Sequence, residues 1–192
     1  GLTGELNLGE CTSLTSIGTY AFQSCRGLTS ISLPSSLTSI GYNAFDGCSS
    51  CSGLTSISLP SSLTSIGDNA FRDCRGLTSV DLSGCTSLTS IGGTAFYSCS
   101  GLTSISLPSS LTSIGSLAFF NCSSLTEVII DSEYVYTNAT AASECGYLLD
   151  NATTVKVLTS LVSGSHAYIN STNFPSVTTD VIDGKKNTVS SK

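Results

Sequence analysis

The sequence has no tryptophan, no methionine and only one histidine, His166. A Ser-His-acid triad would have to use His166, which lies in a Gly-Ser-His turn where a solvated loop histidine is the favoured interpretation. The acidic residues lie at no spacing that predicts a shared cleft: Asp46, Asp68, Asp73, Asp81 and Glu127. We therefore expect no enzymatic activity, no metal site and no cofactor. The absence of methionine indicates a chain that is processed or belongs to a longer one.

Charge is also scarce, since charged residues make up 10% of the 192 residues and the net charge is -6. Lysine and arginine form no cluster that could neutralise a row of phosphates, so we expect no nucleic-acid partner. No run of 18 or more apolar residues occurs, which predicts no membrane span. Nine cysteines would be a liability in a reducing cytosol and favour an oxidising compartment.

A sequence repeat fills most of the chain. It reads LTSISLPSSLTSIGYNAFDGC over residues 28–48 and recurs nearly unchanged over 54–74 and 102–122. An Ala-Phe dipeptide marks each copy, and its phenylalanines are spaced 23, 26, 25 and 23 residues apart: Phe22, Phe45, Phe71, Phe96 and Phe119. A cysteine stands three residues after each phenylalanine, and a step of 23 residues reaches a degenerate sixth copy: Cys25, Cys48, Cys74, Cys99, Cys122 and Cys145.

Each copy begins as a short strand, because its L-x-x-I-x-L pattern places apolar residues on one face and serines on the other. Pro34 ends the first such strand, since proline cannot donate to a strand ladder. A second short run, 37–40, closes on Gly41. The Ala44-Phe45 corner is then predicted to turn the chain back as a short helical turn. One copy cannot bury its own apolar face, and stacked copies can.

These residues resemble the BspA-like branch of the leucine-rich-repeat superfamily, whose unit reads roughly L-x-x-I-x-L-P-x-x-L-x-x-I-G-x-x-A-F-x-x-C. The resemblance covers residues 5 to about 145, with five copies in register. It implies an extracellular or cell-surface protein with a role in adhesion and matrix-protein binding. The expected partners are other proteins.

The predicted fold is a leucine-rich-repeat solenoid, mainly β, with parallel strands in about six coils of 23–26 residues. We expect one parallel sheet from 28–33, 54–59, 77–82, 102–107 and 125–130. The phenylalanines and the cysteines should each form a column along the stack. Residues 1–145 are predicted to form the solenoid. Residues 146–192 are predicted to form an atypical C-terminal cap with a strand at 154–158, and 139–145 is a candidate helix.

The cysteine column allows two interpretations. Neighbouring coils bring cysteine Cα atoms within disulfide range, so cross-links along the column are possible. Small buried thiols that pack as apolar residues are favoured, because free cysteine is among the most buried residue types. Cys51 lies in an insertion, and a disulfide from it to a column cysteine is a further hypothesis. Cys48 and Cys51 form a C-x-x-C without a second pair, so zinc binding is not expected.

The outward positions of the predicted sheet form a candidate binding face that is rich in hydroxyls: Ser30, Ser32, Ser56, Ser58, Ser79, Asp81, Ser104 and Ser106. Tryptophan, tyrosine and arginine, which dominate binding hot spots, are absent from it. It suits many weak polar contacts of a structural or adhesive module. The alternative is a surface that faces glycans or ice, although serine in place of a Thr-x-Thr array argues against ice.

Four sequons are candidate N-glycosylation sites: Asn121, Asn138, Asn151 and Asn170. Asn121 is the poorest acceptor, because cysteine is the middle residue of its sequon. At the other end of the chain, residues 1–4 lead directly into Leu6 and Leu8 without a polar cap. This end is expected to be covered by further sequence or by another copy, and the second option would give a head-to-tail filament.

Overall fold

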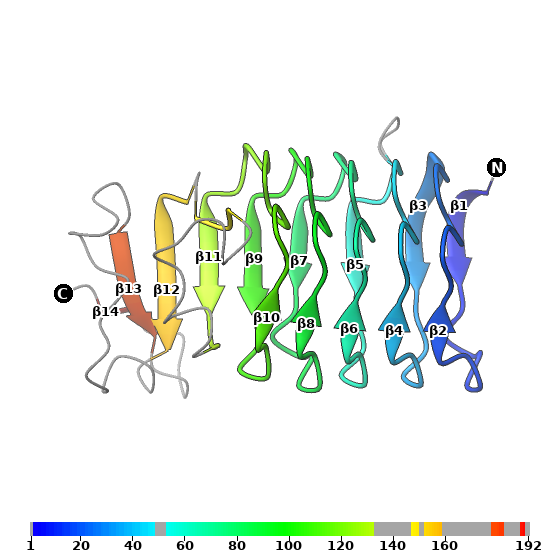
Figure 1. Cartoon of the computed structure of the whole chain (residues 1–192), viewed down its shortest axis with the longest axis horizontal. Helices are drawn as coiled ribbons and strands as arrows, with labels where there is room; N and C mark the ends of the chain where they lie inside the picture. Colours follow the sequence, from blue (N-terminus) through cyan, green and yellow to red (C-terminus); the bar gives the residue numbers. More distant parts are fainter. Residues whose placement is uncertain are drawn as a thin grey trace.

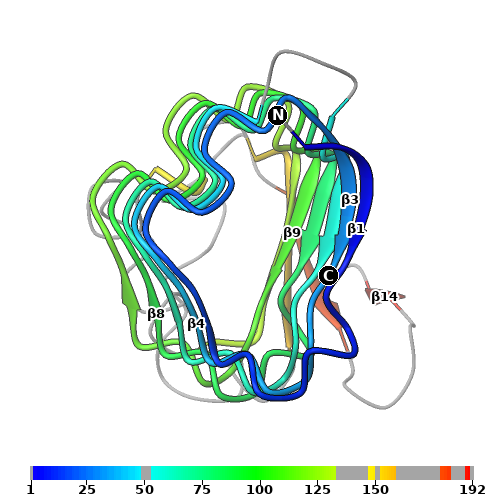
Figure 2. The ribbon, with the colours of Figure 1, turned by 90° about the vertical axis from the view of Figure 1, so that its right-hand side faces the viewer.

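The computed structural model describes residues 2–48, 53–132, 147–149, 152–158, 178–182 and 189–190. Its strands follow one another along a rod from β1 at one end to β13 at the other (Figure 1). Seen along the rod, the successive coils superimpose on one outline (Figure 2). The predicted parallel β-solenoid is therefore confirmed.

The first strand of each coil lies on one side of the rod. These strands are β1 (Thr3–Asn7), β3 (Gly27–Ser32), β5 (Ser56–Ser58), β7 (Ser79–Asp81), β9 (Ser104–Leu107) and β11 (Glu127–Ile130). Inward leucine, isoleucine and valine alternate with outward residues, as the L-x-x-I-x-L pattern predicts, and the outward residues of β5 and β9 are serines. The pairing among β5, β7, β9 and β11 is parallel and in register, with Ile57 opposite Val80 and Val80 opposite Ile105.

The second strand of each coil is only two residues long and lies on the opposite side of the rod. These strands are β2 (Ser16–Ile17), β4 (Ser39–Ile40), β6 (Ser65–Ile66), β8 (Ser90–Ile91) and β10 (Ser113–Ile114). They pair in parallel as one five-stranded sheet in the order β10-β8-β6-β4-β2. Five coils of the described chain thus carry both strands.

The first-strand sheet is interrupted between β3 and β5, and we call this boundary the seam. β1 pairs only with β3, whereas β5 begins a separate sheet in the order β14-β13-β12-β11-β9-β7-β5. The prediction of one continuous sheet is therefore wrong at the seam. The connection from Cys48 to β5 contains the inserted Ser49-Ser50-Cys51. On the opposite side β4 and β6 remain paired across the same two coils.

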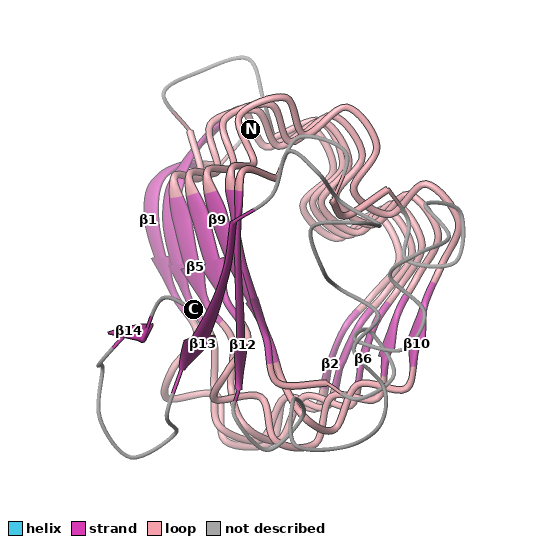
Figure 3. Ribbon diagram, turned by 90° about the vertical axis from the view of Figure 1, so that its left-hand side faces the viewer, coloured by secondary structure: helices cyan, strands magenta, loops and turns pink. Residues whose placement is uncertain are grey.

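The corners contain turns, and no helix occurs among the described residues (Figure 3). The predicted helical turn at the Ala-Phe dipeptide is therefore wrong. Each corner has two residues with positive φ, such as Asn69 at 55° and Asp73 at 56°, and left-handed residues interrupt an α-helix. The corner amides instead bond to the next coil, for example from Phe45 N to the Ala70 carbonyl at 2.8 Å.

The core lies between the two sheets and the corners. Phe45, Phe71, Phe96 and Phe119 are fully buried, and Phe22 at the first coil is partly exposed. Their rings stack in one column with neighbouring centroids 5.1 to 5.3 Å apart. One leucine and isoleucine set per coil fills the rest of the section, so the core continues along the rod.

The described strands of the C-terminal flank continue the first-strand sheet. β12 (Thr154–Leu158) pairs with β11 and with β13 (Thr178–Ile182), both in parallel. β14 (Val189–Ser190) pairs antiparallel with β13. The strand predicted at 154–158 is confirmed. The candidate helix at 139–145 lies outside the described residues.

Candidate binding surfaces

The outward face of the first-strand sheet carries the predicted hydroxyl rows. Ser56, Ser79 and Ser104 face the same way on β5, β7 and β9, because their Cα atoms are partners in the ladder. A second row consists of Ser58, Asp81 and Ser106. Ser30 and Ser32 lie across the seam, on β3, where their partners are Glu5 and Asn7 of β1. The seam thus divides the predicted face into two parts.

A shallow pocket on this face lies at the seam. It has a volume of about 290 Å³, and its lining is half hydroxyl and half apolar: Ile31, Ser32, Leu33, Ser35, Ser58 and Pro60. Ser32 and Ser58 belong to the predicted face. The pocket is open to solvent, so it offers a ligand a contact surface without enclosing it.

The threonines that precede the strands form rows of their own. In the five-stranded sheet, the hydroxyl of Thr38 donates to the Thr15 carbonyl at 3.0 Å and that of Thr64 to the Thr38 carbonyl at 2.8 Å. Thr89 and Thr112 repeat this contact at 3.2 and 3.0 Å. These hydroxyls join neighbouring coils, and each keeps only acceptor capacity for a ligand.

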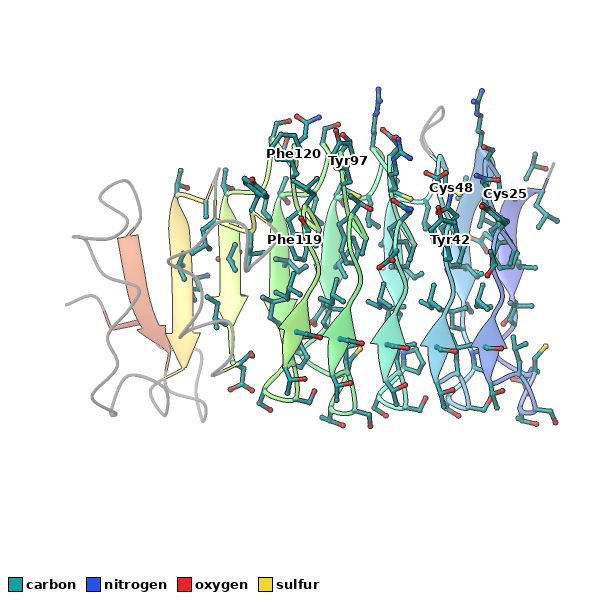
Figure 4. The ribbon with its side chains drawn as sticks, viewed as in Figure 1. Cys25, Tyr42, Cys48, Tyr97, Phe119 and Phe120 are labelled. Carbon is teal, nitrogen blue, oxygen red and sulfur yellow. The ribbon has the colours of Figure 1, made fainter. Side chains whose placement is uncertain are left out.

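A second candidate surface runs along the corners and was not predicted. The residue after each buried phenylalanine points outward, and from the third coil onward it is Arg72, Tyr97 and then Phe120. The Arg72 guanidinium lies 5.8 Å from the Tyr97 ring centroid, and the Tyr97 and Phe120 centroids are 5.7 Å apart. Tyr147 packs edge-on against Phe120 at 5.2 Å. We call these four residues the aromatic edge; Tyr97 and Phe120 are visible along the upper edge of Figure 4.

The aromatic edge is exposed, as Phe120 keeps 38% of its surface in solvent and the Arg72 side chain 45%. Arginine and tyrosine are the residue types that binding hot spots favour. Tyr20 and Tyr42 form another exposed pair near the first coils, with their rings perpendicular and 5.6 Å apart. The exposed rings of the described chain thus lie at the corners and not on the hydroxyl rows.

The five described column cysteines follow the phenylalanines along the stack. Cys48, Cys74, Cys99 and Cys122 are buried, and Cys25 is partly exposed. Each buried thiol donates to the carbonyl of the phenylalanine in the preceding coil, at 3.1 to 3.2 Å. All five carry free thiols, as do Cys11 and Cys85.

Burial in the core is the main cause of the raised pKa of Cys85, Cys99 and Cys122. It raises the pKa of Cys122 to about 12 and that of Cys85 to about 11. Desolvation also raises the pKa of Cys99. Cys48 differs, because a hydrogen bond from the Cys74 thiol lowers its pKa.

Some predicted site residues lie outside the described residues: Asn138, Asn151, Asn170, Cys51, Cys145 and His166. Asn121 is exposed at a corner, and its Nδ2 donates to the Ser98 hydroxyl at 3.0 Å. Within the described ranges, histidine, cysteine and acidic side chains form no group of three that could hold a metal ion. Those ranges also contain no helix that is long and apolar enough to cross a bilayer.

Two solved structures share this architecture. The leucine rich repeat protein of T. pallidum is 31% identical with a TM-score of 0.60, over 76% of this chain and 67% of that one. A leucine-rich repeat protein from Bacteroides ovatus is 26% identical with a TM-score of 0.50, over 93% of this chain. This chain spans 45% of the Bacteroides protein. No curated protein sequence matches significantly.

A family model decides the classification. The BspA type leucine rich repeat region matches residues 6–83 and 49–175, in six copies. These matches cover both the stacked coils and β12 of the flank. The chain belongs to the BspA-type leucine-rich-repeat family.

Proposed function

We propose that this chain is a non-enzymatic adhesive scaffold, located outside the cell or on its surface, that binds an extracellular-matrix protein. The aromatic edge carries this proposal. Arg72, Tyr97, Phe120 and Tyr147 make a continuous row of exposed or partly exposed side chains on a surface otherwise dominated by serine and threonine. Contiguous exposed apolar patches mark interaction sites, and a rigid scaffold lowers the entropy cost of binding.

Binding to a panel of purified extracellular-matrix proteins, measured by biolayer interferometry, tests the proposal. The double variant Tyr97→Ser/Phe120→Ser removes two ring contacts from an exposed surface. Ser104→Ala/Ser106→Ala on the sheet face is the matched control. The proposal expects at least a tenfold weaker affinity for the aromatic variant and wild-type affinity for the control, since a hot-spot residue contributes about 2 kcal/mol or more.

Two results would overturn this assignment. If only the sheet-face variant lost binding, the hydroxyl rows would be the contact surface. If the unaltered chain bound no matrix protein, the adhesive role itself would be lost. Folding of each variant is checked by thermal melting, because the substituted residues lie outside the buried core and should change the melting temperature little.

The extracellular location is supported by the nine cysteines and by the sequons of the C-terminal flank. We propose that Asn138, Asn151 or Asn170 carries glycan if the source is a eukaryote, with Asn121 the poorest acceptor. The Asn121 Nδ2 already donates to the Ser98 hydroxyl, so a glycan on this nitrogen would leave one N–H for that contact. An intact mass of the native protein equal to the unmodified chain mass would remove this support.

The second candidate function uses the hydroxyl rows as a glycan- or ice-facing surface. The regular placement of Ser56, Ser79 and Ser104 favours it, because repeated hydroxyls at coil spacing can match a periodic ligand. A glycan array and a thermal-hysteresis measurement test the two ligands. Retention of either activity by Tyr97→Ser/Phe120→Ser, and its loss in Ser104→Ala/Ser106→Ala, would favour this candidate over the aromatic edge.

We also propose head-to-tail association of copies into filaments. β1 and β2 lie at the ends of their sheets, and Leu6 and Leu8 are only partly buried there. Strand edges of this kind pair readily with another chain. Sedimentation velocity over a range of concentrations tests the idea, and a monomer at every concentration would contradict it.

A further inference from the structure

One pair of column cysteines differs from the others. The Cys74 thiol donates to the Phe45 carbonyl at 3.2 Å, and it is also the side chain that can donate to a thiolate on Cys48. Cys48 in turn donates to the Phe22 carbonyl at 3.2 Å. For Cys99 the corresponding contact is with the backbone of Cys74. Among the described column cysteines, an interaction of this kind between side chains lowers the pKa of one partner only for Cys48 and Cys74.

Backbone hydrogen bonds hold these two cysteines at the same level of neighbouring coils. The Phe45 amide donates to Ala70 at 2.8 Å, and the Gly47 amide donates to Arg72 at 2.9 Å. Neighbouring parallel strands lie about 4.8 Å apart. Disulfides accept Cα separations of roughly 4.4 to 6.8 Å, so the two residues can be bridged without breaking the corner.

The pair also joins the two coils that meet at the seam. β3 and β5 share no ladder, so these coils are held by the β4–β6 pair, the corners and the core. A coil boundary with fewer backbone hydrogen bonds opens locally at a lower free-energy cost. A covalent link at this boundary would constrain the joint of the rod that lacks the first-strand ladder.

We propose that Cys48 and Cys74 are a dithiol that closes to a disulfide on exposure to an oxidised low-molecular-weight thiol, linking the second and third coils across the seam. The Cys48 thiolate attacks one sulfur of the oxidant, which forms a mixed disulfide and releases one thiolate. Cys74 then gives up its proton to the medium, and its sulfur displaces the second thiol. Two protein thiols are oxidised, and one disulfide of the oxidant is reduced to two thiols.

The chemistry of the two sulfurs supports these roles. The hydrogen bond from Cys74 lowers the pKa of Cys48, and thiolate is the attacking form of cysteine. The same hydrogen bond, with burial, raises the pKa of Cys74, which suits the residue that reacts second. Both sulfurs are buried, so attack requires the corner to open, and the missing β3–β5 ladder lowers the cost of opening at this boundary.

The test uses the full chain with glutathione disulfide at pH 8, followed by alkylation of remaining thiols, intact mass and peptide mapping. The proposal expects the loss of two hydrogens and a Cys48–Cys74 linked peptide. The oxidised chain should melt about 5 °C or more higher than the reduced chain, because closing a loop of this length restricts the unfolded state. The Cys51→Ser variant should still form the bond.

Two variants separate the proposed pair from its neighbours. Cys74→Ala should keep one glutathione on Cys48 and show no rise in melting temperature, whereas Cys122→Ala should oxidise as the unaltered chain does. A linked peptide of Cys48 with Cys25 or Cys51, or full reactivity of both thiols after oxidation, would overturn the proposal. If Cys74→Ala failed to fold, the linked peptide of the unaltered chain would still decide it.

Discussion

The rings of Phe45 and Phe71 stack with their centroids 5.2 Å apart and their planes within 3° of parallel. The two residues are separated by 26 positions, and both are fully buried. Their contact shows how the rod is held together: the same side chain in the next coil is the packing partner. Removing one ring therefore removes contacts with two neighbours.

Phe71→Ala should lower the free energy of unfolding by about 3–5 kcal/mol, because it truncates a buried aromatic side chain and leaves a cavity. Urea denaturation followed by circular dichroism measures this. Phe22→Ala is the matched control, since Phe22 is partly exposed and has one described stacking neighbour. A loss below about 1 kcal/mol at Phe71 would contradict its burial.

Gly115→Ala should destabilise the rod by about 1–3 kcal/mol through overpacking. A Cβ atom on Gly115 would lie 2.2 Å from the Gly93 amide nitrogen, which belongs to the backbone of the preceding coil. Gly84→Ala is the control, because a Cβ there meets nothing within 4 Å. Thermal melting of both variants measures the difference, and equal melting temperatures would refute the close contact between coils.

Thr94→Asn should stabilise the chain by about 1 kcal/mol, because Thr94 has a φ of 53° and asparagine tolerates the left-handed region better than a β-branched residue. Asn69 already holds the same position of the preceding coil. The new amide can also replace the bond from the Thr94 hydroxyl to Asn69 Oδ1. Thr94→Ala lacks this donor and should be less stable. A urea unfolding midpoint of Thr94→Asn below that of the unaltered chain would contradict backbone strain at Thr94.

Stability should fall above pH 9. Burial raises the pKa of Cys122 from 9.0 to about 12, so the unfolded chain loses this proton at lower pH than the folded chain. The resulting stabilisation is complete below pH 9 and is lost as the pH rises toward 12. Unfolding free energies at pH 8 and pH 11 measure the effect, and Cys122→Ala should show a smaller difference between them. If Cys122→Ala showed the same difference between pH 8 and pH 11 as the unaltered chain, groups other than Cys122 would cause the pH dependence.

The repeat alone predicts most of this fold, because each copy repeats the L-x-x-I-x-L and Ala-Phe positions that face the core. It does not predict the corner turns, since Asn43 and Asn69 take left-handed conformations that composition alone does not reveal. The insertion at 49–51 shows where the copies differ in length. It does not predict that β3 and β5 are unpaired. The aromatic edge was missed because Arg72, Tyr97 and Phe120 occupy a variable position of the repeat. Comparing that position from copy to copy would have found it.

The hydroxyl and thiol donors that join the coils all reach in one direction. Ser36, Thr38 and Cys48 each donate to a carbonyl of the first coil, and Ser62, Thr64 and Cys74 repeat this toward the second. Truncation therefore has different effects at the two ends of the rod. Deleting the last coil leaves these side-chain donors of the remaining coils paired, whereas deleting the first leaves those of the second without acceptors. During synthesis, the hydroxyl and thiol donors of each emerging coil meet acceptors already in place, whereas its corner amides pair with the coil that follows.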